Sequence, residues 1–129
     1  MSGTYLRAWE WPWSWPVSPG AVRSREQLAD NDFRRTNPRF AEDNMEPNLA
    51  LLENIERLAS ERSVTPGQIA LAWLLHRGDD IVPIPGTKRL EYLEQNVAAA
   101  DITLSAGELD QLEQAFPEGS AHGARYADM

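Results

Sequence analysis

The sequence lacks cysteine altogether and is poor in basic residues. The absence of cysteine excludes a disulfide framework, a thiolate metal site and a cysteine nucleophile. Twenty acidic residues stand against 12 basic ones, which gives a net charge of -8. Such a chain repels a phosphate backbone unless its few cations are concentrated on one face. We therefore expect no nucleic-acid partner.

Long apolar runs are missing as well. No stretch approaches the roughly 18 apolar residues that a membrane-spanning helix needs, so we expect no membrane partner. The beginning of the chain has no continuous apolar stretch followed by a small-residue cleavage site, so no secretory signal is predicted and a cytoplasmic location is expected. A length of 129 residues with 42% hydrophobic residues predicts one globular domain rather than two.

Residues 1–20 differ in character from the rest of the chain. Four of the five tryptophans lie between residues 5 and 19, with prolines among them. Neither a helix nor a central strand tolerates prolines at this density, and we interpret residues 1–20 as a disordered or aberrant segment. Insertion into a membrane interface, or binding to a proline-recognising groove, is the less favoured alternative because flanking cations and a helical period are both absent.

Two helices are predicted in the middle of the chain. The first covers residues 47–61, with Pro47 in its first turn and one apolar face formed by Leu51, Leu52, Ile55, Leu58 and Ala59. The second covers residues 66–77 and starts at the capping box Thr65-Pro66-Gly67-Gln68. Apolar residues cover most of its circumference, which predicts burial on more than one side. Gly78 is suited to the left-handed position that ends such a helix.

A buried strand and two further helices are predicted after residue 80. The run Ile81-Val82-Pro83-Ile84-Pro85-Gly86 is typical of a short strand covered on both faces. Leu90, Leu93 and Val97 mark the inner face of a helix over residues 89–99. A second capping box, Ser105-Ala106-Gly107-Glu108, opens a fourth helix that ends at Phe116-Pro117. The tail from Glu118 is expected to be mobile.

The junction between the predicted strand and its helix is a candidate anion site. Gly86 and Thr87 place free backbone amides and the positive end of a helix dipole at one point, and Lys88 and Arg89 add two formal charges. This combination suits the phosphate monoester that distinguishes NADP from NAD. Gln95 and Asn96 lie about two turns along and are placed to reach an adenine edge. The same pattern also occurs at ordinary solvated helix starts, which is the alternative for these residues.

Four blocks of sequence closely resemble the C-terminal third of aldo-keto reductases. These blocks are RRTNPRF at residues 34–40, NLALLENI at 48–55, VTPGQIALAWLL at 64–75 and IVPIPGTKRLEYLEQN at 81–96, in the order and spacing of that family. The resemblance covers residues 21–129. It implies an α/β fold by descent, the C-terminal portion of a (β/α)8 TIM barrel. Because the portion is incomplete, it is expected to be predominantly helical as it stands.

The resemblance also implies a cofactor and a reaction. In such enzymes the segment like Gly86-Thr87-Lys88-Arg89 holds the 2'-phosphate of NADP(H), and the residues matching Gln95 and Asn96 contact the adenine. Such enzymes use NADPH to reduce aldehydes and ketones, so a small carbonyl compound is the implied substrate. The resemblance implies that residues 21–129 form the C-terminal part of an NADP-binding barrel.

The sequence departs from the family in two places. The Asp, Tyr, Lys and His tetrad of the family comes from the N-terminal half of the barrel, which we expect to be missing, so no catalytic residue is assigned and the chain alone is expected to be inactive. Accordingly, no role passes to Tyr5, Tyr92, Tyr126, His76 or His122. Upstream of Ala21 the family's pyrophosphate loop is replaced by unrelated sequence. A frameshift or a misplaced start codon would produce this pattern, a hypothesis that the upstream DNA sequence tests.

An incomplete barrel would leave apolar faces exposed. We therefore expect a marginally stable product that self-associates through its barrel face, aggregates or needs a complementary fragment. The alternative function is a non-catalytic, acidic helical module that binds a partner. A metal site is the most distant reading, because Glu42-Asp43 and Asp79-Asp80 are adjacent pairs whose side chains point apart, and no metal ligand is assigned.

Overall fold

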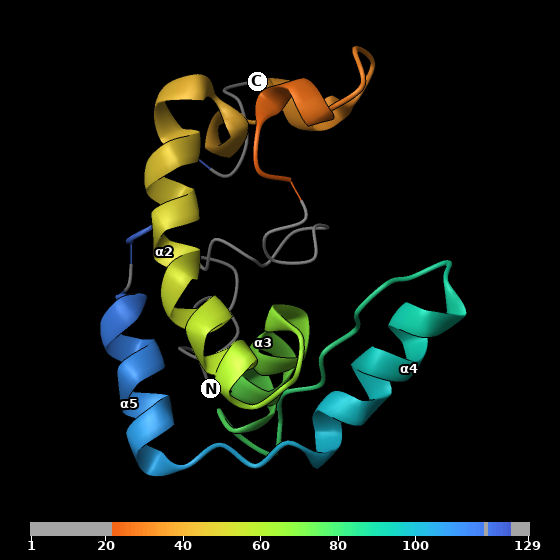
Figure 1. Ribbon diagram of the computed structural model, residues 1–129, viewed down its shortest axis with the longest axis vertical. Helices are drawn as coiled ribbons and strands as arrows, with labels where there is room; N and C mark the ends of the chain where they lie inside the picture. The colour runs from red at the N-terminus through yellow and green to blue at the C-terminus, as the bar shows by residue number, and fades with distance from the viewer. Residues whose placement is uncertain (1–21, 118, 125–129) are drawn as a thin grey trace. The chain divides into compact units, whose positions relative to one another are not determined.

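The computed structural model describes residues 22–117 and 119–124, and the predicted boundary between residues 20 and 21 lies outside them. The chain divides into two compact units instead of the single domain that its length predicts. Unit 2 runs from Asn54 to Ala115, and unit 1 contains the segments before and after it. Within the described residues all regular elements are helices (Figure 1). The prediction of a predominantly helical chain is therefore confirmed.

Unit 1 contains three short 3-10 helices and the first part of helix α2. The short helices are η1 (Arg25–Gln27), η2 (Phe33–Thr36) and η3 (Pro38–Phe40). They are stabilised by local side-chain bonds. The Asp32 carboxylate, for example, accepts hydrogen bonds from the backbone and guanidinium of Arg34, which lower its pKa to about 2. The guanidinium of Arg35 donates to the carbonyl of Leu28. These bonds close the loops in front of α2.

Helix α2 spans Glu42–Glu61 and begins five residues earlier than predicted. The amides of Asn44 and Met45 donate to the carbonyl of Ala41, so the first turn forms before Pro47 is reached. Pro47 removes one helical hydrogen bond without ending the helix. The predicted apolar face is confirmed for Leu52, Ile55, Leu58 and Ala59, which are buried, whereas Leu51 is half-buried.

Two residues of the tail after residue 118 contact the rest of unit 1, and the expected mobility of the tail stays a prediction. The side-chain amide of Asn48 accepts from the His122 amide at 2.8 Å and donates to the His122 carbonyl at 2.9 Å. Gly123 has a φ of +88° and lies so close to the Pro38 carbonyl that a Cβ would be 2.7 Å from it. This backbone clamp explains why the tail adopts a defined path here.

Unit 2 is built on helix α3, Pro66–Leu75, which is buried through Ile69, Ala72 and Trp73. The Thr65–Gln68 capping box forms as predicted. The helix ends two residues early, and the prediction of a left-handed Gly78 is wrong. The His76 amide is shared between the Ala72 and Trp73 carbonyls and the Arg77 amide donates to the Leu74 carbonyl, so the last turn tightens to the 3-10 pattern. The Nδ1 atom of His76 also lies 2.7 Å from the Ala72 carbonyl. The Nε2 atom of His76 accepts from the Leu104 amide at 3.3 Å, so this ring has a structural role.

Helix α5, Ala106–Ala115, completes the packed part of unit 2. It starts with the predicted second capping box, in which Ser105 and Glu108 bond to each other's amides. The Glu108 carboxylate also accepts two hydrogen bonds of 2.6 Å from the guanidinium of Arg62, just beyond the end of α2. This bidentate pair joins the end of α2 to the start of α5.

The predicted strand at residues 81–86 does not form. These residues have no regular secondary structure, the Ile81 amide donates to the Gly78 carbonyl in a turn, and the exposed fractions of Val82 and Ile84 are 79% and 91%. A strand requires a neighbour that supplies hydrogen bonds, and the described residues contain none. Pro83 and Pro85 also lack the N–H groups that such pairing uses.

Helix α4, Leu90–Ala98, continues into the 3-10 helix η4, Ala99–Asp101. The prediction that Leu90, Leu93 and Val97 form an inner face is wrong, because their exposed fractions are 70%, 50% and 66%. The helix is attached to α3 by another face: the Gln68 side chain donates to the Gln95 carbonyl, and Ala99 is buried. The apolar row has no partner in the described part of the chain.

Among the described residues, none of the helices combines the length and the apolar character that crossing a membrane demands.

Candidate functional site

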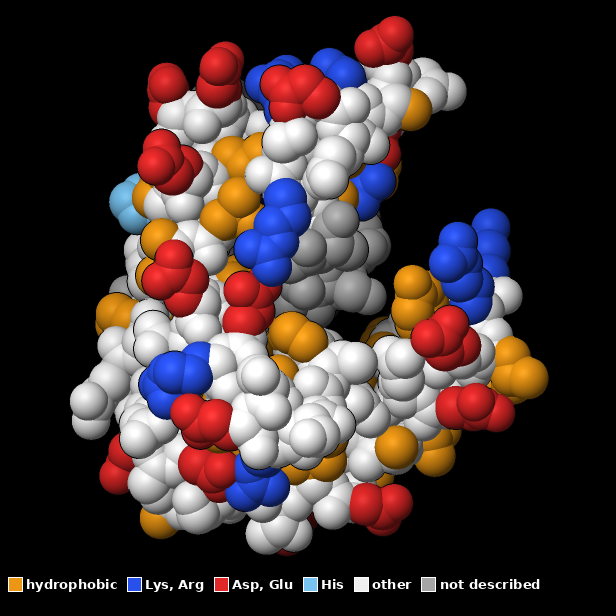
Figure 2. Space-filling model, viewed as in Figure 1, with side chains coloured by type: hydrophobic (Ala, Val, Ile, Leu, Met, Phe, Trp, Pro, Cys, Tyr) orange, Lys and Arg blue, Asp and Glu red, His pale blue; other side chains and the backbone are white. Residues whose placement is uncertain are grey.

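The predicted phosphate-binding residues lie at the N-terminal end of α4. Gly86 and Thr87 end the extended segment, and Lys88 and Arg89 form the bend that leads into the helix. The Thr87 hydroxyl accepts from the Arg89 amide at 3.2 Å, which fixes the bend. Gly86, Lys88 and Arg89 are exposed, and Figure 2 shows basic side chains gathered at this end of the helix.

The first amides of α4 are available to a ligand. The first hydrogen bond of the helix is made by Leu93, whose amide donates to the Arg89 carbonyl. The amides of Leu90, Glu91 and Tyr92 have no acceptor in the described part of the chain. Unbonded amides at a helix N-terminus, together with the helix dipole, favour an anion. These features make the N-terminal end of α4 a candidate anion site.

The two cations of this end are placed differently. Lys88 makes no ion pair with any described residue. The guanidinium carbon of Arg89 lies 5.6 Å from the centre of the Tyr92 ring, a cation–π distance. Because Tyr92 follows Arg89 by three positions, it holds the guanidinium on one face of α4 while the charge stays exposed.

Gln95 and Asn96, the two predicted adenine contacts, are both half-buried but lie on different faces of α4. The Gln95 side chain donates to the Glu91 carboxylate at 3.4 Å, and its carbonyl accepts from Gln68. Asn96 follows Arg89 by seven positions, which places it on the face of Arg89 and Tyr92. The geometry thus groups Arg89, Tyr92 and Asn96 more closely than it groups Gln95 with them.

Tyr92 belongs to this group although the sequence pattern at residues 86–89 does not include it. The family resemblance passes no catalytic role to it. The signal that identifies it is its spacing from Arg89 and Asn96, three and four positions away on the same helical face. An exposed aromatic ring at this point offers a surface on which a planar base can stack.

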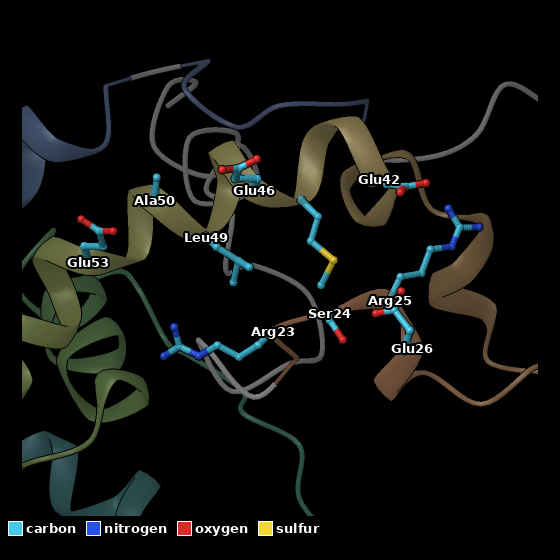
Figure 3. A pocket seen from close by; sticks show the side chains of 10 residues that line it. Arg23, Ser24, Arg25, Glu26, Glu42, Glu46, Leu49, Ala50 and Glu53 are labelled. Carbon is cyan, nitrogen blue, oxygen red and sulfur yellow. The ribbon is translucent and has the colours of Figure 1, made fainter.

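Unit 1 contains an open groove of about 520 Å³ between α2 and residues 23–26. Four glutamates and two arginines line it, together with apolar residues such as Leu49 (Figure 3). The Arg25 guanidinium already donates to the Arg35 carbonyl. An excess of carboxylates disfavours a phosphate group, so the N-terminal end of α4 remains the better anion site.

The described residues contain no group of three acidic or histidine side chains that could hold a metal ion. Of the two histidines, His76 caps α3, and His122 is attached through its backbone to Asn48 while its side chain is exposed. Among the described residues, neither imidazole ring is hydrogen-bonded to an acidic side chain or to a side chain that could act as a nucleophile.

Comparison with known proteins identifies the family. The sequence model of the aldo/keto reductase family matches residues 13–116, a range that includes all six predicted cofactor-binding residues. The chain belongs to the aldo/keto reductase family. The matched range begins before residue 20, and the boundary expected there stays a prediction. No solved structure matches the chain.

Three relatives illustrate the likeness. Aldo-keto reductase yakc (NADP(+)) of Schizosaccharomyces pombe is 45% identical over 107 residues, which are 83% of this chain and 32% of the relative. Probable aldo-keto reductase 1 of Glycine max is 41% identical over 101 residues, 78% of this chain and 29% of the relative. Aldo-keto reductase str7 of Strobilurus tenacellus is 38% identical over 110 residues, 85% of this chain and 33% of the relative. The chain spans about a third of the length of these relatives.

Proposed function

We propose that this chain supplies the cofactor-binding segment of an NADP(H)-dependent aldo-keto reductase, an oxidoreductase that reduces aldehydes or ketones. The observation that carries the proposal is the N-terminal end of α4, where three unbonded amides and two exposed cations meet. The name of the Schizosaccharomyces pombe relative, which includes NADP(+), supports the choice of cofactor.

The residues present fit the 2'-phosphate of the cofactor. The amides of Leu90, Glu91 and Tyr92 donate hydrogen bonds, and Lys88 and Arg89 supply charge at the same end of the helix. Gly86 has no atom within 4 Å of the position of a Cβ, so there is open space on this side of the bend. A phosphate monoester of charge near −2 is the ligand that this combination of donors favours over a neutral hydroxyl.

Each residue has a separate part in binding. Thr87 holds the bend through its bond to the Arg89 amide, and Tyr92 orients the Arg89 guanidinium. Asn96, on the same face, is placed to contact the base with its amide, while Gln95 is proposed as a weaker contact because Glu91 already binds its side chain. When bound, the cofactor supplies the hydride. The tetrad that completes the reaction is proposed to come from barrel sequence outside this chain.

A cofactor titration tests the proposal. NADPH and NADH are titrated by calorimetry into the wild type and into Lys88→Ala, Arg89→Ala and the double variant. We expect NADPH to bind more tightly than NADH, and each substitution to weaken NADPH binding about tenfold, equivalent to about 1.4 kcal/mol. NADH binding should change little, because its 2'-hydroxyl does not require the cations.

Arg57→Ala is the matched control, because Arg57 is an exposed helix arginine that pairs with Glu61, away from the candidate site. It should leave NADPH binding unchanged. Equal affinity for NADPH and NADH in the wild type would contradict the proposal. An equal loss in the Arg57 control would show that net charge, not the site, determines binding.

The alternative function, a non-catalytic binding module, has one specific observation in its favour. The apolar row of α4 is exposed and has no partner in the described part of the chain. The two functions are separable by substitution, since the cations of the cofactor site and the apolar residues of the row occupy different positions on the helix.

A further inference from the structure

The side chain of Gln68 joins helix α3 to helix α4. It lies in the first turn of α3 and is half-buried. Its Oε1 atom accepts a hydrogen bond of 3.0 Å from the Thr65 amide, within the capping box, and its Nε2 atom donates to the Gln95 carbonyl of α4 at 3.1 Å. The two ends of the side-chain amide cannot be exchanged, because the Thr65 amide can only donate and the Gln95 carbonyl can only accept. One side chain therefore caps α3 and holds α4.

The bond from Gln68 reaches α4 between the two predicted adenine contacts. The Gln95 carbonyl belongs to the peptide group that joins Gln95 to Asn96. This carbonyl also accepts from the Ala99 amide at the end of the helix, so Gln68 is its second donor. A carbonyl oxygen has two lone pairs, and both are used here. The peptide group that carries Asn96 cannot turn without losing one of these bonds.

Helix α4 needs such an attachment because it is short and exposed. It has nine residues and no buried residue of its own. Isolated helices of fewer than about 12 residues are only marginally formed in water, and most helical stability in proteins comes from packing. The next buried residue is Ala99 in η4, which packs against α3. Loss of the Gln68 bond is therefore expected to loosen the turns of α4 that precede Ala99.

We propose that Gln68 is a positioning residue for the cofactor site and acts through the Gln95 carbonyl. Its Nε2 atom keeps α4 helical, which holds the unbonded amides at the start of the helix and Asn96 in one arrangement. The ligand, a nucleotide with a 2'-phosphate, is taken from the proposed function, on which this inference rests. The ordering of α4 by Gln68 is measurable without any ligand.

Gln68→Glu separates the two bonds of this side chain. Glutamate is a usual partner of threonine in a capping box, so its carboxylate still accepts from the Thr65 amide. Near neutral pH it has no hydrogen to donate to the Gln95 carbonyl. Amide hydrogen exchange of residues 93–97, followed by NMR, should become about fivefold faster than in the wild type, as expected for one lost hydrogen bond. The amides of Ala72 and Trp73 in α3 should exchange at unchanged rates.

The same variant offers a rescue that a purely structural defect would not show. A glutamate side chain takes up a proton near pH 4.3, and the protonated acid has an O–H that can donate to the Gln95 carbonyl. The difference in α4 exchange between Gln68→Glu and the wild type should therefore shrink at about pH 3.5. No difference near neutral pH, or an equal difference at both pH values, would overturn the proposal.

Binding of 2'-AMP connects the attachment to the site. Gln68→Met keeps the length of the side chain and adds no charge that could repel a phosphate. It should weaken 2'-AMP binding about fivefold in an amide NMR titration. Thr65→Ala is the matched control, because it removes the hydroxyl of the capping box and leaves the Gln68–Gln95 bond. It should leave 2'-AMP affinity unchanged.

The outcomes separate this inference from the proposed function. An equal loss of affinity in Thr65→Ala would show that Gln68 acts only by capping α3, and it would overturn the positioning role. Unchanged affinity in Gln68→Met, with a wild type that binds 2'-AMP, would also overturn that role and leave the proposed function intact. A wild type that does not bind 2'-AMP would contradict the proposed function itself.

Discussion

Two apolar segments of unit 2, helix α3 and residues 81–98, have opposite environments. In α3, Ile69, Ala72 and Trp73 are buried and both ends are fixed, by the Thr65–Gln68 box and by His76. In residues 81–98, Val82, Ile84 and the row of α4 are exposed. Both segments are rich in large aliphatic residues, so composition does not separate them. The two segments differ in whether another element of the described residues packs against their apolar side chains.

The comparison shows that the candidate site lies on the less packed of the two segments. Helix α4 has no buried residue of its own and is attached to α3 by the Gln68–Gln95 hydrogen bond and by the buried Ala99 of η4. Segments with few buried contacts open at low free-energy cost, so binding there must order the site as well as contact the ligand. We therefore expect cofactor affinity to be modest even if all six predicted residues take part.

The largest effect is expected from truncating a core side chain, a change that should be costly in α3 and nearly neutral in α4. Ile69→Ala should reduce the free energy of unfolding by about 2–5 kcal/mol, because Ile69 has 0% exposure and its removal leaves a cavity. Val97→Ala should change it by less than about 0.5 kcal/mol. Urea unfolding followed by circular dichroism measures both. Similar losses in the two variants would show that α4 is packed as tightly as α3.

A smaller effect is expected at the Arg62–Glu108 pair, which stabilises the packed segment only. Hydrogen bonds from Arg62 lower the pKa of Glu108 from 4.5 to about 2. A depressed folded-state pKa adds stability above the unfolded value, and this stability is lost as the pH falls from about 5 toward 2. Because the pair is partly solvated, its contribution is about 1 kcal/mol or less.

Glu108→Gln should remove this part of the pH dependence. The variant should be less stable than the wild type at pH 7 and approach it near pH 2, as measured by urea unfolding at several pH values. Asp110→Asn is the control, because Asp110 is exposed on the same helix and makes no ion pair with any described residue. A constant difference between wild type and Glu108→Gln at every pH would argue against the ion pair as its cause.

Local signals in the sequence predicted the packed segment well. The Thr65 and Ser105 capping boxes formed because each needs only four neighbouring residues. The buried face of α2 followed from helical spacing. Two of the predictions that failed depended on partners distant in the sequence: residues 81–86 need a neighbouring strand, and Leu90, Leu93 and Val97 need a covering surface. The left-handed Gly78 and the start of α2 were local predictions that also failed. Apolar spacing predicts which residues can be buried. It does not predict whether another part of the chain covers them.

The sequence of residues 86–89 indicates the candidate site in outline, because a glycine, a threonine and two cations before a helix favour anion binding. The side-chain contacts within the site could not be predicted from the sequence. The pairing of Arg89 with Tyr92 and of Gln95 with Glu91 depends on side-chain directions around α4. The clamp of Asn48 on His122 joins residues 74 positions apart and left no local signal.

The most direct test of the central claim is a comparison of 2'-AMP and 5'-AMP by amide NMR on the labelled chain. We expect 2'-AMP to shift the amide resonances of Leu90, Glu91 and Tyr92 in a saturable manner, and 5'-AMP to shift them far less. Lys88→Ala should weaken the response to 2'-AMP. Equal responses to the two nucleotides, or none at the start of α4, would contradict the assignment of this helix end to the 2'-phosphate.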